Sequence, residues 1–156
     1  MLLLDTPSRS LQVALSASKT ANDCPFFASW LDISQTTFAA TAAASADGTT
    51  NGETAVTLVA APPNNGITRQ LKYLSLQNAD TVATTPTIQV NDGGTTYNLI
   101  IPTLQVGESL QYNAEEGWRV YTTTGAIKTG IAGPTGAQGP TGPSGGPTGP
   151  TGPTGP

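Results

Sequence analysis

The chain has 156 residues, a length that suits one domain, and its last 27 residues hold ten of the 18 glycines and seven of the 13 prolines. Six basic against ten acidic residues give a net charge of −4 with no basic run, so the sequence excludes the electrostatic pattern of a protein that binds nucleic acid or an anionic membrane. Histidine is absent, which excludes His-based catalysis, and the single cysteine, Cys24, excludes an internal disulfide framework.

Residues 1–15 are predicted to form an extended docking arm or an edge strand. The apolar Met1–Leu4 is too short for an export signal or a membrane span, so we expect the protein to be made and assembled in the cytoplasm. Farther on, Leu11, Val13 and Leu15 alternate with Gln12 and Ala14 in the period-two pattern of a half-buried strand.

A second unit, residues 16–128, is predicted to be the folded domain. Pro25 breaks the chain before a short β-prone run at Trp30–Ile33. Phe38–Ala46 is ambiguous because alanine favours helix while the neighbouring Thr36, Thr37 and Thr41 favour strand or turn. The Asp-Gly and Asn-Gly pairs of Asp47–Glu53 predict a loop, and Thr54–Ala60 reads as the next strand.

The β pattern becomes stronger after residue 69. Gln70–Asn78 alternates apolar and polar residues and is predicted to be a central strand. Asp92–Gly94 predicts a hairpin turn, and a second hairpin has Gly117 where a positive φ is needed. About six to eight short strands with regular turns predict an all-β, antiparallel, jelly-roll-like sandwich.

From Gly130 onward glycine occupies every third position, apart from one slip in register at Gly145. Only glycine fits at the axis of a collagen triple helix, and a flexible Pro/Gly linker, the alternative, would not keep the period. We therefore predict a homotrimer whose shaft, residues 129–156, is short enough to need the preceding β-domain as its clamp. The predicted axial glycines are Gly130, Gly133, Gly136, Gly139, Gly142, Gly146, Gly149, Gly152 and Gly155.

No pattern in the sequence predicts catalysis or a cofactor. Nucleotide-binding and hydrolase motifs are absent, and the adjacent Glu115 and Glu116 fit a solvated hairpin turn better than an acid/base pair. Asp92 beside Gly93 fits a turn better than a calcium site. We expect no enzyme activity, no metal and no cofactor.

Several aromatic residues are open to two interpretations. Phe26, Phe27 and Trp30 form either a core cluster, which we favour, or a partner-binding patch. Trp118 either packs in the core, packs against the trimer axis or supplies an aromatic platform for carbohydrate.

Three segments together carry a resemblance to a known class of proteins. The segments "MLLLDTPSRSLQVAL", "TRQLKYLSLQNADTVATTPTIQVNDGGTTYNL" and "LQVGESLQYNAEEGWRVYTTTGAIKTG", followed by collagen triplets, resemble virion appendage proteins of tailed bacteriophages, of the head, neck or tail fibre kind. The resemblance implies a structural virion protein with a docking N-terminus, a trimeric β-domain and a projecting shaft. Docking to capsid, neck or tail proteins would then involve Leu2, Leu3, Leu4, Arg9, Leu11, Val13 and Leu15, by strand addition to a partner sheet.

The same residues leave alternatives open. The N-terminal segment could instead complete its own sandwich, and the shaft could meet a separate tip protein or a host surface, with the present chain expected to be truncated after Pro156. Rival classes are a bacterial surface or spore-coat collagen-like filament and a stalked carbohydrate-binding sandwich.

Overall fold

The computed structural model describes residues 1–128 and contains only strands and connections there. No helix capable of crossing a membrane occurs among these residues. The ten strands, more than the number predicted, are β1 (Leu3–Leu4), β2 (Arg9–Leu15), β3 (Pro25–Ser34), β4 (Ala40–Thr49), β5 (Val56–Val59), β6 (Ile67–Gln77), β7 (Pro86–Asp92), β8 (Thr95–Ile100), β9 (Ser109–Asn113) and β10 (Gly117–Tyr121).

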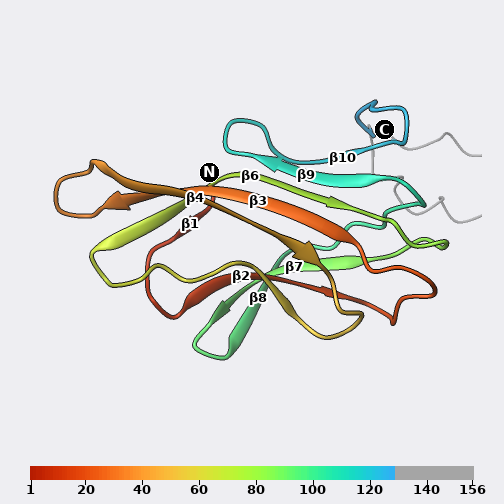
Figure 1. Ribbon diagram of the computed structural model, residues 1–156, viewed down its shortest axis with the longest axis horizontal. Coiled ribbons are helices and arrows are strands. Elements are labelled where there is room, and N and C mark those ends of the chain that lie inside the picture. The colour runs from red at the N-terminus through yellow and green to blue at the C-terminus, as the bar shows by residue number, and fades with distance from the viewer. Residues whose placement is uncertain (129–156) are drawn as a thin grey trace, which may run out of the picture.

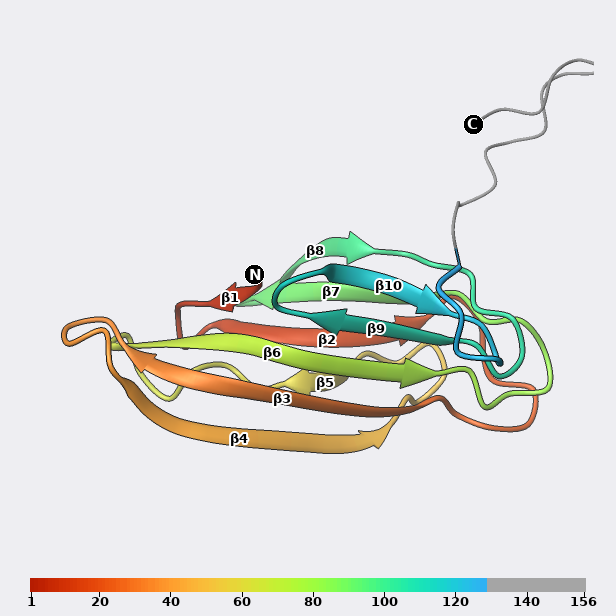
Figure 2. The same ribbon diagram turned by 90° about the horizontal axis from the view of Figure 1, so that it is seen from above.

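The strands form two antiparallel sheets in a sandwich-like arrangement, which confirms the predicted all-β antiparallel class. One sheet has the order β10-β9-β6-β3-β4, with β1 also pairing with β6, and the other has the order β5-β2-β7-β8. Figure 1 shows β9 and β10 in the upper layer and β2, β7 and β8 in the lower. Figure 2 shows that β8 and β10 lie along one margin of the sandwich and β4 along the opposite margin.

The core lies between the sheets and consists of the inward-facing side chains of both. Leu74 and Leu76 of β6 are fully buried, which confirms the predicted central strand. On the other sheet Leu11, Val13 and Ile88 are equally buried. The period-two pattern in the sequence therefore identified the buried faces of these strands correctly.

Both predicted hairpins are present. β7 pairs with β8 through a turn in which Gly93 and Gly94 have φ of 59° and 102°. β9 pairs with β10, and Gly117 has the expected positive φ of 77°. Pro102 follows the end of β8, as its missing N–H predicts.

The middle of the chain differs from the prediction. Pro25 begins a ten-residue strand instead of merely interrupting the chain, and the ambiguous alanine-rich segment belongs to β4, which continues through Asp47, Gly48 and Thr49 into the predicted loop. Pairing with β3 along nearly its whole length holds β4 extended. Pairing with the preceding strand therefore prevails over the helix propensity of alanine and the turn propensity of Asp-Gly.

The N-terminal segment is also placed differently from an arm or an edge strand. β2 is hydrogen-bonded to β5 on one side and to β7 on the other, so residues 9–15 form an interior strand of the four-stranded sheet. The sequence left open whether this segment docks on a partner or completes its own sandwich. The observed pairing corresponds to the second alternative. The predicted shaft glycines, from Gly130 to Gly155, and the register slip at Gly145 lie outside the described residues.

Candidate functional site

The N-terminal residues predicted to dock on a partner begin with a short strand fixed to the protein's own sheet. Leu3 and Leu4 pair with Gln70 and Arg69 of β6. The backbone N–H of Leu2 donates a hydrogen bond to the Tyr112 hydroxyl at 2.6 Å. Leu4 is buried, whereas Leu3 is 42% exposed and points its side chain away from the core. Of this short strand, Leu3 is the side chain that a partner can reach.

Arg9 makes contacts inside its own chain. Its guanidinium donates from Nε to Asp92 Oδ2 at 2.8 Å and from Nη1 to Asp5 Oδ1 at 2.7 Å. The Asp92 carboxylate also accepts from the Ser8 hydroxyl, and this bond, followed by the bond from Arg9, lowers the pKa of Asp92. The cluster fastens the start of β2 to the end of β7, and Asp92, which had been considered for calcium, is occupied by these donors.

Leu11, Val13 and Leu15 have their side chains in the core, with exposed fractions of 5% or less. Strand addition to a partner requires an unpaired strand edge, and β2 has neighbours on both sides. These three residues hold the domain together and present no free surface.

The remaining sequence candidates for chemistry are structural or solvated. Glu115 and Glu116 lie exposed in the turn between β9 and β10, where Glu116 accepts from the Asn113 amide. Cys24 is fully buried, and burial raises the pKa of its thiol. Across residues 1–128 no group of His, Cys, Asp and Glu side chains is arranged to hold a metal ion.

The N-terminal aromatic cluster is divided between two faces of β3. Phe26 and Trp30 are buried in the core, whereas Phe27 is 43% exposed on the outer face and lies 6.4 Å from the Tyr73 ring, measured between centroids. The favoured core interpretation therefore holds for two of the three residues.

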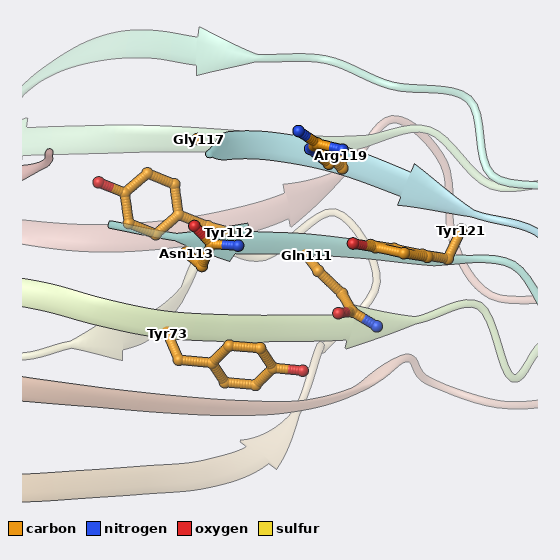
Figure 3. Close-up of a pocket in the computed structure, with 7 residues that line it drawn as sticks. All are labelled: Tyr73, Gln111, Tyr112, Asn113, Gly117, Arg119 and Tyr121. Atoms are coloured by element: carbon orange, nitrogen blue, oxygen red, sulfur yellow. The ribbon is translucent and has the colours of Figure 1, made fainter. Parts of the chain in front are cut away.

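The outer face of the larger sheet carries a shallow polar and aromatic hollow. Figure 3 shows its side chains on three neighbouring strands: Tyr73 on β6, Gln111 and Asn113 on β9, and Arg119 and Tyr121 on β10. This surface was not predicted from the sequence. It could have been predicted from the polar residues of the period-two pattern, because residues that alternate with buried ones along a strand share the outer face of the sheet.

A second hollow lies at the margin where β8 and β10 run, and we call it the edge groove. It has a volume of about 290 Å³. Trp118 stacks at an angle against Tyr112, with ring centroids 4.9 Å apart, so it is half-buried and not a free-standing aromatic platform. The lining residues are Met1, Leu2, Leu99, Tyr112, Gly117 and Trp118.

Compared with known proteins, the chain matches no family model, no curated protein and no solved structure.

Proposed function

We propose that the protein is a structural component of a tailed-phage virion, the trimeric base of an appendage that carries a collagen-like shaft. The observation that carries this proposal is the glycine at every third position from Gly130 to Gly155, apart from the slip at Gly145, directly after a β-domain. In this role the protein acts by presenting a shaft on the surface of the particle and performs no catalysis.

The physical argument concerns how a short triple helix is held together. Eight complete triplets without charged residues form a marginal helix. A preceding domain that brings three chains into register raises their effective concentration and lowers the entropic cost of nucleation. Residues 1–128 form a domain with a continuous core of its own, and we assign this role to it.

The proposal includes an anchor at the N-terminal region, with capsid, neck or tail proteins as partners. Leu3 is 42% exposed, so its side chain is the apolar contact that this region offers, whereas Met1, which is 71% exposed, lines the edge groove. The distal end of the shaft would meet a tip protein or a host surface.

The test is a mass measurement of the purified full chain by light scattering or native mass spectrometry. We expect three times the chain mass, together with a collagen-type circular dichroism signal that melts separately from the β-domain. A monomer at micromolar concentration would defeat the proposal. Labelling the N-terminus on intact particles then distinguishes a head from a neck or tail position.

A stalked carbohydrate-binding sandwich is the second candidate, and the outer-face hollow favours it. Exposed Phe27 beside Tyr73, with Gln111 and Arg119 nearby, combines apolar ring faces with amide and guanidinium donors. Titration with neutral disaccharides, comparing the natural chain with Tyr121→Ala, tests this candidate, because binding that the substitution abolishes would support it. A bacterial surface or spore-coat filament, the third class, would be excluded by finding the protein in purified phage particles.

A further inference from the structure

The segment from Gly93 to Gly107 contains the edge strand β8 and carries no charged residue. Four of the ten large hydrophobic side chains exposed in residues 1–128 lie in this segment. They are Tyr97 (57% exposed), Leu99 (40%), Ile101 (54%) and Val106 (50%). Tyr97 and Leu99 lie on β8 itself, at one margin of the sandwich, and Ile101 and Val106 lie in the connection that follows it.

An exposed strand edge with apolar side chains is a site of association with other chains. Proteins usually protect such an edge with charged side chains, or they cover it. β8 ends before Pro102 but has no lysine, arginine or acidic residue along its length. Its composition is that of an edge covered in the assembled protein.

The hydrophobic core is also open at this margin. The edge groove separates Leu99 of β8 from Trp118 of β10, and Ile100, Trp118 and Val120 are only partly buried although they pack against the core. Figure 2 shows β8 and β10 at the same margin, opposite β4. Apolar surface on both strands therefore remains for a partner to bury.

The described part of the chain ends along the edge of β10 that does not pair with β9. After Tyr121 the chain turns back: the N–H of Thr122 donates to the carbonyl of Ala126, and the N–H of Lys128 donates to the carbonyl of Val120, both at 2.8 Å. Lys128 also donates from Nζ to Glu108 at 2.9 Å. Residues 126–128 are thus fixed along β10.

One residue, Thr129, lies between Lys128 and Gly130, the first predicted axial glycine. The two Cα–Cα steps from Lys128 to Gly130 span at most about 7 Å. In a triple helix the glycines of three chains crowd together at the axis. The β10 edge of every copy must then lie close to that axis, which brings the neighbouring β8 edge toward another copy.

We propose that the margin formed by β8, the edge groove and the Val120–Lys128 hairpin is the surface through which three copies of this chain meet. The occupant of the edge groove is a second copy of the same chain. This inference rests on the trimer of the proposed function and adds the location of its interface.

The first test measures the accessibility of one position on this margin in the full chain. Leu99→Cys and Phe27→Cys replace side chains of nearly equal exposure, 40% and 43%, on the margin and on the outer face. Cys24 is fully buried and does not contribute in the folded protein. We expect a maleimide to modify Leu99→Cys about tenfold more slowly, since burial of one apolar side chain in an interface suffices for such a factor.

The second test uses charge in place of reactivity. Leu99→Glu is expected to lower the trimer fraction at micromolar concentration, whereas Phe27→Glu leaves it unchanged, with the β-type circular dichroism spectrum of each variant as the folding control. Burial of an unpaired carboxylate in an apolar interface is unfavourable, which is the reason for the difference.

The outcomes separate this inference from the proposal beneath it. If the protein is a trimer but Leu99→Cys reacts as fast as Phe27→Cys, the proposed interface is wrong and the trimer itself stands. The margin would then be exposed and open to a virion partner. A natural chain that is monomeric would overturn the trimer and the interface together.

Discussion

Asp80 is a buried carboxylate that organises the connection between β2 and β3. It accepts hydrogen bonds from the backbone N–H groups of Thr20 and Ala21, each at 2.7 Å, of Thr81 at 2.8 Å and of Asn22 at 3.2 Å. These bonds, that from Thr20 most of all, stabilise the charged form against the opposing effect of burial and lower the pKa of Asp80 from 3.8 to about 2. The charge therefore contributes to folding.

Asp80→Asn is expected to lower the melting temperature at neutral pH, because an amide replaces the charged acceptor. A carboxyl whose pKa is depressed in the folded state stabilises the protein above its unfolded pKa, and this stability disappears as pH falls from 3.8 toward about 2. The difference in melting temperature between the two proteins should therefore shrink over that interval. Asp47→Asn, on an exposed carboxylate of β4, is the control and should show no such difference.

The ion pair of Asp32 and Arg69 is another buried charge cluster. Arg69 donates from Nε and Nη2 to the two oxygens of Asp32 at 2.7 and 2.8 Å, and its guanidinium carbon lies 4.8 Å from the centroid of the Trp30 ring. Both side chains are about one-tenth exposed. The paired geometry joins β3 to β6 in the interior of the larger sheet.

Removing one partner leaves the other charge buried and unpaired. Asp32→Ala is expected to lower the free energy of unfolding by about 3 kcal/mol. Glu116→Ala, which removes the exposed partner of Arg119, should lower it by no more than about 1 kcal/mol. Denaturant unfolding at one fixed chain concentration measures both, and equal effects would contradict the argument.

At the scale of elements, two turn glycines with nearly the same φ differ in their surroundings. Gly107 and Gly117 have φ of 78° and 77°. A methyl group at Gly117 would meet no atom within 4 Å, whereas one at Gly107 would lie 2.8 Å from Cγ2 of Thr123. Alanine would therefore strain the backbone at both positions, but it would clash with a neighbouring side chain only at Gly107.

Gly117→Ala is expected to destabilise the domain by about 1 kcal/mol through its positive φ, and Gly107→Ala by a larger amount. In a Thr123→Ser background, which removes the clashing methyl group, Gly107→Ala should lose only about as much stability as Gly117→Ala. Thermal melts of the four variants check this. If Thr123→Ser gives no relief, the clash is not the cause.

The strands with regular alternation were predictable from sequence, and β4 was not. β6, β7 and β9 alternate apolar with polar side chains, so their period is visible to inspection. β4 has alanines on both faces and is exposed along most of its length, so nothing in its pattern identifies a strand. Its ladder with β3, the preceding strand, defines it, and that pairing is not visible in the residues of β4 alone.

The candidate surfaces were likewise predictable from sequence only in part. The apolar residues near the N-terminus were identified by sequence, yet Leu11, Val13 and Leu15 are core residues because β2 lies between two neighbours. Sequence also identified Trp118 as an aromatic residue with a role in the core, at the trimer axis or in binding. It could not show that Leu99 and Met1 lie beside Trp118, because these residues come from distant parts of the chain.

For the whole molecule, the proposed trimer makes the shaft and the domain interdependent. Gly136→Ala is expected to abolish the collagen-type circular dichroism signal, because a methyl group does not fit at the axis of a triple helix. Ala137→Ser, at a neighbouring position of the same triplet that is not axial, is the control and should retain the signal. Retention of the signal in Gly136→Ala would show that the repeat does not form a triple helix.

The sequence by itself determined the all-β class, the two hairpins with their turn glycines, the central strand β6 and the three-residue glycine period, because each depends on neighbours along the chain. The tertiary structure decided that β2 is an interior strand, that β4 is a strand at all, and that β8, β10 and the end of the described chain share one apolar margin. The places of β2, β8 and β10 depend on pairing between segments that are distant in the chain, and β4 is a strand because it pairs with its neighbour β3.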